Sequence, residues 1–204
     1  MSDVKDAKKE NLYQSVLQLL EQGSDIHDIK VSDIARAAGM GKGTVYEYFT
    51  SREELIARAV LYAIHLKVLE VNELLQSTRG FDAMLRCLCS YIIEQSRTQK
   101  FLLDSIFNES GLHEIRSLLE TSSELMRDGE LIRQYVSMLI SEAEREGVLR
   151  TQANRHYAEQ AVRTALFGLV REASCPLLFL KNNCPDDMLI DNTIKFLRGA
   201  LKEA

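Results

Sequence analysis

The sequence predicts an all-α protein with a small N-terminal group of three helices joined to a larger helical domain. Only 2 prolines and 10 glycines occur in 204 residues, so few positions can break a helix. Apolar residues also recur at three- and four-residue steps along most of the chain, which is the period of an amphipathic helix. A chain of this length can bury a core without disulfides or metals.

The composition is typical of a globular protein, with 46% hydrophobic and 27% charged residues. The net charge of −5 argues against a protein that coats polyanions in general. It leaves room for a local DNA-reading face, which needs only a few well-placed cations. The polar N-terminus, the lack of a membrane-spanning apolar run and 4 cysteines without framework spacing lead us to expect a cytoplasmic protein.

Two helices are predicted before residue 40. Residues 5–23 carry an apolar stripe, and a polar loop separates them from a second, short helix over residues 31–38. Ser32 and Asp33 stand near the start of this second helix, and Gly39 follows its end, as helix caps would require.

A third short helix and a long fourth helix follow. Val45 and Phe49 are four residues apart and predict the inward face of the third helix. Ser51 and Glu54 form the S-x-x-E pattern of a capping box, which predicts a helix over 51–76. The fourth helix therefore joins the N-terminal group directly to the rest of the chain.

The remainder of the chain shows no repeat and no flexible linker. We expect helices over residues 81–97, 100–109, 113–147, 154–181 and 186–202. The helix over 113–147 is expected to bend near Asp128 and Gly129, and the pair Pro185 and Asp186 is typical of a first helical turn.

The two short helices and the turn AGMG between them predict a helix-turn-helix, whose second helix enters the DNA major groove. Lys42 can meet a phosphate or a guanine edge, and Thr44 can bond a phosphate at a helix N-terminus. Gly43 lets the backbone approach the groove closely. The candidate DNA-binding residues are Ser32, Lys42, Gly43, Thr44, Tyr46, Tyr48 and Arg52.

The run VSDIARAAGMGKGTVYEYFTSREEL resembles the N-terminal DNA-binding domain of the TetR family of transcriptional repressors. This resemblance implies a DNA-binding domain over 1–56, with the helix-turn-helix at about 31–50, and a helical effector-binding and dimerisation domain over 57–204. It also implies that the residues from Lys42 to Tyr46 touch bases or nearby phosphates, and that Tyr48 and Arg52 bind phosphates. Glu47 departs from the usual chemistry of such a helix; it faces solvent or accepts a hydrogen bond from a cytosine.

Two stripes near the C-terminus suit a homodimer interface, because the resemblance implies that the last two helices form a four-helix interface. Small side chains let another helix approach closely, and the alternative is that both stripes belong to the core of one chain. The candidate interface residues are Ala158, Ala161, Ala165 and Gly168 on one helix and Ile190, Ile194, Leu197 and Leu201 on the last.

The resemblance also implies a ligand cavity lined by the middle helices, for an apolar or aromatic effector. Each candidate residue is otherwise an ordinary core side chain. The candidates are Tyr62, Tyr91, Phe101, Phe107, Asn108, His113, Met126, Arg133, Tyr135 and Met138.

Other kinds of chemistry find little support. The histidines lack metal-site spacing, so no metal or cofactor is expected, and no nucleophile elbow or phosphate loop indicates an enzyme. Cys87 and Cys89 face different sides of a helix, and Cys175 and Cys184 flank a helix end, where they form either a redox pair or inert thiols.

The sequence thus predicts a dimeric repressor that binds a near-palindromic operator and is released by a small molecule. The alternatives are a regulator without such an effector, controlled by a partner or by redox state, and an activator.

Overall fold

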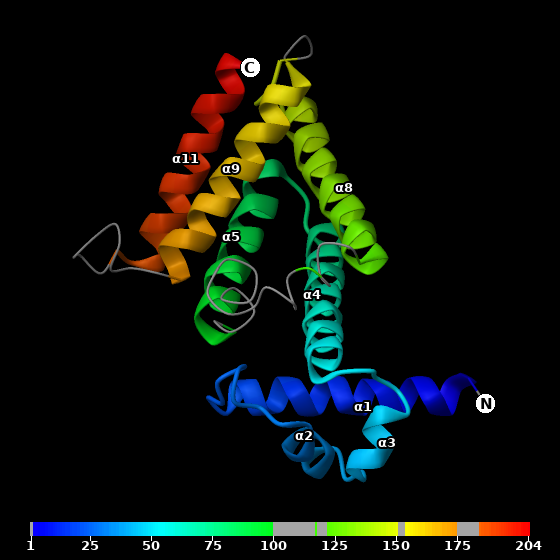
Figure 1. Ribbon diagram of the computed structural model, residues 1–204. Coiled ribbons are helices and arrows are strands. Elements are labelled where there is room, and N and C mark those ends of the chain that lie inside the picture. Colours follow the sequence, from blue (N-terminus) through cyan, green and yellow to red (C-terminus); the bar gives the residue numbers. More distant parts are fainter. Residues whose placement is uncertain (1, 100–116, 118–121, 151–153, 175–183) are drawn as a thin grey trace. The chain divides into compact units, whose positions relative to one another are not determined.

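The structure is a computed structural model that describes residues 2–99, 117, 122–150, 154–174 and 184–204 (Figure 1). Within these residues it contains eight α-helices and no β-strand, which confirms the all-α prediction. The helices are α1 Ser2–Glu21, α2 Val31–Ala37, α3 Lys42–Tyr46, α4 Arg52–Ser77, α5 Phe81–Thr98, α8 Ser123–Arg145, α9 Arg155–Ser174 and α11 Asp186–Glu203. None of these described helices combines the length and apolar character that a membrane crossing requires.

The chain divides into two compact units. The first unit is Met1–Lys67 with Phe101–Asp128, and the second unit is Val68–Lys100 with Gly129–Ala204. The predicted helix over 100–109 lies outside the described residues, as does the predicted helix over 154–181 beyond Ser174. The other predicted helices are present with ends shifted by a few residues, except at the start of α8.

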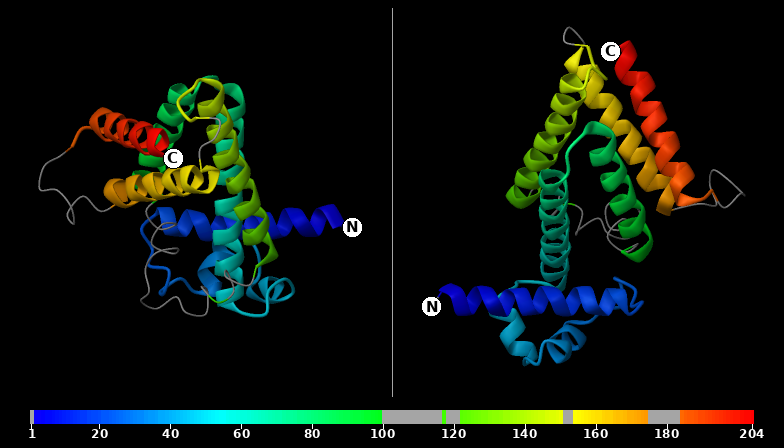
Figure 2. Two further views of the ribbon diagram at one scale, coloured as in Figure 1. Left: turned by 90° about the horizontal axis from the view of Figure 1, so that it is seen from above. Right: turned by 180° about the vertical axis from the view of Figure 1, so that it is seen from behind.

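The core of the first unit lies between α1, α2, α3 and the first turns of α4 (Figures 1 and 2). The predicted stripe of α1 is buried there, through Leu12, Val16 and Leu20. Ile34 of α2 and Val45 of α3 meet this stripe in the same core. Packing of these apolar side chains holds the two short helices α2 and α3 on α1, since a helix of five to seven residues is not stable alone.

Gly39 ends α2 in the way the sequence predicts. Its φ angle is +65°, which only glycine adopts readily. The Gly39 amide donates to the Arg36 carbonyl at 3.2 Å, and the Met40 amide donates to the Ala35 carbonyl at 2.8 Å. This pair of bonds is a Schellman motif, which closes α2 and turns the chain toward α3.

The starts of α2 and α4 differ in detail from the prediction. Helix α2 begins at Val31, so Ser32 lies inside its first turn, and the Asp33 carboxylate accepts the Lys30 amide at 3.3 Å. At α4 the Ser51 hydroxyl accepts the Glu54 amide at 3.0 Å, as in a capping box. The Glu54 carboxylate, however, accepts the amide and the hydroxyl of Thr50, at 2.8 and 2.6 Å. The carboxylate thus caps one residue earlier than the motif predicts.

The prediction of one helix over 113–147 was wrong at Ser122, which is not helical. The Ser122 hydroxyl accepts the amides of Glu124 and Leu125, at 3.1 and 3.2 Å. Ser122 is therefore the N-cap of a new helix, α8. Helix α8 continues through Asp128 and Gly129 without a break in its helical assignment.

Within the first unit, two side-chain pairs tie the first turns of α8 to α4. Arg58 Nη1 donates to Glu124 Oε1 at 2.7 Å. Two helical turns further along α4, His65 Nδ1 lies 2.8 Å from Oδ1 of the buried Asp128. Because a carboxylate is costly to bury without a partner, His65 stabilises the Asp128 side chain in this position.

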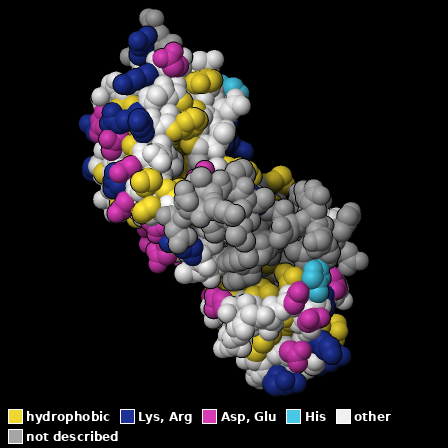
Figure 3. All heavy atoms as spheres, turned by 90° about the vertical axis from the view of Figure 1, so that its left-hand side faces the viewer, with side chains coloured by type: hydrophobic (Ala, Val, Ile, Leu, Met, Phe, Trp, Pro, Cys, Tyr) yellow, Lys and Arg dark blue, Asp and Glu magenta, His cyan; other side chains and the backbone are white. Residues whose placement is uncertain are grey.

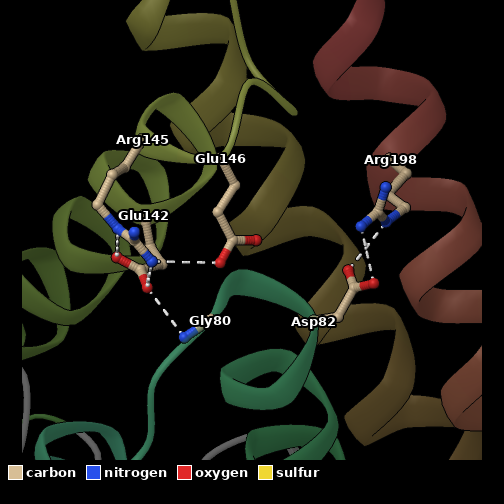
Figure 4. Close-up of polar contacts among 6 residues, drawn as sticks. All are labelled: Gly80, Asp82, Glu142, Arg145, Glu146 and Arg198. Carbon is tan, nitrogen blue, oxygen red and sulfur yellow. Dashed lines mark hydrogen bonds and ion pairs between the residues drawn. The ribbon is translucent and has the colours of Figure 1, made fainter.

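In the second unit, α5, α9 and α11 pack against one another (Figure 2). Apolar side chains of these helices are buried, among them Leu189, Leu197 and Leu201 of α11 and Val162 and Leu169 of α9. Three exposed pairs also join α5 to α11. Arg198 contacts Asp82 through two hydrogen bonds (Figure 4). Arg86 contacts Asp191, and Arg97 contacts Asp186.

The predicted apolar stripe of α11 requires a correction. Ile190, Ile194, Leu197 and Leu201 are already buried within the single chain. They belong to the core that α11 shares with α9 and α5, which was the alternative interpretation of the pattern. Periodicity identifies the face of a helix that is buried but does not identify the chain that buries it.

The turn between α4 and α5 is held by a carboxylate from α8. Gly80, which has a φ angle of +92°, donates its amide to Glu142 Oε1 at 2.9 Å (Figure 4). Arg145 binds the same carboxylate with Nε at 3.0 Å and Nη2 at 2.7 Å. These hydrogen bonds, with that of Arg145 first, lower the pKa of Glu142 to about 2.

Replacing Glu142 by glutamine is expected to remove a pH-dependent part of the stability. Because the pKa of Glu142 is lower in the folded than in the unfolded chain, its contribution is present above about pH 4.5 and is lost as the pH falls toward about 2. Urea unfolding of wild type and Glu142→Gln at pH 7 and pH 3 measures this. The difference in unfolding free energy should be larger at pH 7; an equal difference at both pH values would contradict the assignment.

Candidate nucleic-acid interface

The predicted outward face of the helix-turn-helix is formed by α3 and the residues after it. Val45 and Phe49 are buried, as predicted, and anchor this segment to the core. Lys42 is exposed, and the Tyr46 side chain is 50% exposed although it is a large aromatic residue. An exposed tyrosine next to a lysine on a short helix is available to contact phosphates and bases.

Helix α3 is only five residues long, and Phe49 lies beyond its end. The amides of Tyr48 and Phe49 both donate to the Val45 carbonyl, at 3.0 and 3.1 Å, so the chain continues in a tight turn. This turn brings Phe49 inward and leaves Tyr48 partly buried against the core. Thr44 is also partly exposed. Whether these residues bind DNA stays a prediction.

Two aromatic rings of the first unit pack in a cluster with Phe49. The Tyr13 ring of α1 lies 5.8 Å from the Phe49 ring and 5.5 Å from the Tyr62 ring of α4, centroid to centroid. The Tyr62 hydroxyl donates to Glu10 Oε1 at 2.5 Å. Desolvation and this hydrogen bond raise the pKa of Tyr62. Tyr62, a candidate for the ligand cavity, thus contributes to the packing of the first unit.

Asn11 fixes the turn of the helix-turn-helix and was not found from the sequence. Its Nδ2 donates to the Ala38 carbonyl at 2.9 Å, across 27 residues of sequence. The carbonyl belongs to the residue just before Gly39, at the end of α2. A polar residue on the exposed side of α1 gives no local signal of such a long-range contact, so only the structure reveals it.

Ser32 and Arg52 are less exposed than Lys42 and Tyr46. Ser32 is partly buried at the second position of α2. Arg52 is the first residue of α4, and its guanidinium donates to the carbonyls of Ile26 and Ile29 and to the Glu53 carboxylate. Both DNA contacts stay predictions, and the phosphate contact of Arg52 competes with its contacts inside the protein.

Replacing Gly43 by alanine is expected to stabilise the fold and weaken DNA binding. A Cβ at Gly43 would meet no atom within 4 Å, and alanine is favoured over glycine in a helix by about 0.5–1 kcal/mol. If the backbone of Gly43 approaches the groove closely, the added methyl group holds the DNA away. Thermal unfolding and an operator titration measure the two effects.

The matched control is Gly129→Ala in α8, where a Cβ also meets nothing within 4 Å. It should stabilise the fold similarly and leave operator affinity unchanged. If Gly43→Ala also binds operator as wild type does, the backbone of Gly43 is not close to DNA.

The ligand-cavity candidates that the structure describes differ in burial and in hydrogen-bond partners. Phe101, Phe107, Asn108 and His113 lie outside the described residues. Met126 and Arg133 are exposed, and Arg133 pairs with Glu130. Tyr135 is buried, and its hydroxyl donates to the Val68 carbonyl at 2.9 Å. The Tyr91 hydroxyl donates to Glu70 at 2.6 Å. The ligand cavity therefore stays a prediction.

A hollow of about 680 Å³ lies in the second unit between the end of α4, the start of α5 and α8. Met138 is the only ligand-cavity candidate among the described residues that line it. Leu75 and Met84 line it as well, together with polar side chains such as Gln134 and Ser141, so its wall is mixed. Its volume falls in the range of small-molecule sites.

The described cysteines and histidines give no sign of a metal or redox site. Cys89 is buried, and burial raises the pKa of its thiol to about 11, so the thiol is protonated at neutral pH. Cys175 lies outside the described residues, so its pairing with Cys184 is not addressed. In the described part of the chain, no three His, Cys, Asp or Glu side chains are grouped to hold a metal ion.

Comparison with known proteins agrees with this geometry. The model of the bacterial regulatory proteins of the tetR family matches residues 21–59. An HTH-type transcriptional regulator of Staphylococcus aureus is 39% identical over 57 residues, which span 28% of this chain and 30% of that protein. The match to this curated relative thus covers less than a third of its length.

Solved structures match over almost the whole chain. The transcriptional regulator FadR from Bacillus subtilis, determined with stearoyl-CoA, has a TM-score of 0.63 and 14% identity, and the match covers 96% of this chain and 98% of that chain. A TetR transcription regulator from Haloarcula marismortui has a TM-score of 0.63 and 17% identity, over 97% and 98%. At these identities the likeness shows the fold alone.

The buried Val45 and Phe49, the exposed face of α3 and the turn at Gly39 define a domain of the helix-turn-helix class. The match over residues 21–59, which contains the whole helix-turn-helix, shows that this part of the chain is similar to the DNA-binding domain of the tetR family of bacterial regulatory proteins.

Proposed function

We propose that this protein is a homodimeric repressor that binds a near-palindromic operator through α3 and is released by a small-molecule effector. The observation that carries the proposal is the exposed face of α3, where Lys42 and Tyr46 lie outside a firmly buried Val45. A single helix of this size binds DNA weakly, so two copies spaced by one turn of DNA, about 34 Å, supply the affinity.

The second unit offers a surface for the dimer on α9 and α11. Phe196 and Met188 of α11 are 59% and 53% exposed, and they lie two helical turns apart on one side of the helix. Gly168 of α9 is exposed, Ala161 and Ala165 are partly exposed, and Ala158 is buried. Figure 3 views the molecule from the α11 side and shows hydrophobic side chains among charged ones on the second unit. Such exposed apolar residues favour a protein partner.

Regulation requires that effector binding in the second unit changes the position of helices in the DNA-binding unit. Helices α4 and α8 each begin in the first unit and continue into the second, so both can transmit a change. A coupling of about 1–3 kcal/mol would loosen operator binding about 5- to 150-fold. That FadR was determined with stearoyl-CoA supports an apolar effector, which the sequence analysis also favours.

Operator release tests the effector. The protein bound to a fluorescent operator is titrated with stearoyl-CoA and with a panel of aromatic and acyl compounds, and anisotropy is followed. At least one compound should lower operator affinity by about 5- to 150-fold. If no compound lowers the affinity, but an oxidant or a partner protein does, the protein is a regulator without a small-molecule effector, and the proposal of small-molecule control is wrong.

A further inference from the structure

Arg52 begins α4 and turns its side chain back onto the protein. Its Nε donates to the Ile29 carbonyl at 2.5 Å, and Nη2 donates to the Ile26 carbonyl. Nη1 donates to Glu53 Oε1 at 2.9 Å. The Arg52 side chain is only 24% exposed. All three nitrogens of the guanidinium therefore have a partner inside the first unit.

The two carbonyls belong to the loop that joins α1 to α2. In the described part of the chain, no backbone amide donates to the carbonyl of Ile26 or of Ile29. The Ile29 side chain is buried in the core, and the residue after it, Lys30, precedes the first residue of α2. Because a carbonyl that is shielded from water needs another hydrogen-bond donor, Arg52 supplies the loop with donors that its own backbone does not provide.

The positive charge of Arg52 is paired with the negative charge of the neighbouring Glu53 carboxylate. Glu53 follows it directly and accepts one of its hydrogen bonds, and this bond is the main reason that the pKa of Glu53 is lowered. A guanidinium that is largely buried and paired with a carboxylate has little electrostatic attraction left for a DNA phosphate.

We propose that Arg52 is a positioning residue that fastens the loop at Ile26–Ile29 to the first turn of α4, and that it is not a phosphate ligand. The planar fork of arginine is required, because two carbonyls and one carboxylate are bonded from different nitrogens. Through the loop, Arg52 fixes the start of α2, which packs against α3. The position of α3 therefore depends on the position of the first turn of α4.

This assignment deepens the regulation proposed above and rests on it in one respect. If effector binding moves α4, Arg52 carries that movement to the loop and to α2. The contact itself does not depend on an effector or on an operator, so it can be tested even if the proposed regulation fails.

Two substitutions separate positioning from phosphate binding. Arg52→Lys keeps the positive charge and the ability to bind a phosphate, but it cannot reproduce the fork. Arg52→Gln removes the charge. Lys42→Gln is the control for Arg52→Gln, because it removes one positive charge at an exposed position of α3, on the predicted DNA-binding face. Operator affinity is measured over a salt series, and hydrogen exchange of residues 26–34 is followed without DNA.

Positioning predicts that Arg52→Lys and Arg52→Gln weaken operator binding to a similar extent, by about tenfold, the factor for one lost hydrogen bond of about 1.4 kcal/mol. The slope of log K against log salt stays that of wild type in both. Exchange of the amides in 26–34 becomes faster in both, while Lys42→Gln leaves exchange unchanged and lowers the slope by about 0.9.

Phosphate binding predicts the opposite pattern. If Arg52→Lys binds operator as wild type does and Arg52→Gln lowers the slope by about 0.9, the proposal is overturned. Unchanged hydrogen exchange of residues 26–34 in Arg52→Gln overturns it as well, and this result is obtained without any operator.

Discussion

Replacing Tyr46 by alanine is expected to weaken operator binding by about 1–3 kcal/mol, which is about 5- to 150-fold, without changing the fold. The Tyr46 side chain is exposed, and the core contacts of α3 are made by Val45. Surface substitutions of this kind usually change stability by less than about 0.5 kcal/mol. Titration of a labelled operator and thermal unfolding measure the two quantities.

Lys42→Ala is expected to weaken binding as well and to reduce its salt dependence, since it removes a cation from the same face. Gln18→Ala, an exposed position of α1, serves as the control that should bind as wild type does. Unchanged affinity in both Tyr46→Ala and Lys42→Ala would mean that another face of the first unit meets DNA.

Two adjacent residues of α11 are expected to respond in opposite ways. Leu197 is completely buried in the single chain, so Leu197→Ala should lower the free energy of unfolding by about 2–5 kcal/mol. Its neighbour Phe196 is mostly exposed, so Phe196→Ala should leave the stability of the chain nearly unchanged and weaken the dimer by more than about 1 kcal/mol.

Sedimentation and urea unfolding at several protein concentrations separate these effects. Phe196→Ala should raise the dimer dissociation constant, and Leu197→Ala should lower stability at every concentration. If Leu197→Ala destabilises the protein only when it is dilute, Leu197 acts at the dimer interface as the sequence pattern alone suggested.

Features set by local chemistry could be predicted from the sequence. The apolar spacing of Val45 and Phe49 predicts their burial, and Gly39 predicts the end of α2, because both depend on residues a few positions apart. The start of α8 was missed, although Ser122 and Ser123 before Glu124 are typical of a helix N-terminus.

Contacts between distant parts of the chain could not be predicted in this way. Asn11 reaches a carbonyl at Ala38, and Arg52 reaches carbonyls at Ile26 and Ile29. A backbone carbonyl has no signature in the sequence, so these partners emerge only from the fold. For Arg52, the pattern predicts a DNA contact where the structure has an internal one.

The α11 stripe illustrates a second limit. Ile190 and Ile194 repeat at helical spacing whether they pack on the same chain or on another. The structure separates the two cases, because side chains buried in a single chain cannot also form the surface that meets a second copy. The surface left on α11 is instead centred on Met188 and Phe196.

The most direct test of the central claim is selection of genomic DNA fragments by the purified protein, with excess competitor DNA and in parallel with Tyr46→Ala. The account predicts enrichment of a few fragments that share a near-palindromic site, bound at nanomolar protein and released by added salt, and loss of that enrichment in Tyr46→Ala. If wild type enriches no fragment above competitor, or Tyr46→Ala enriches the same fragments equally, the claim that α3 reads DNA through its exposed face is contradicted.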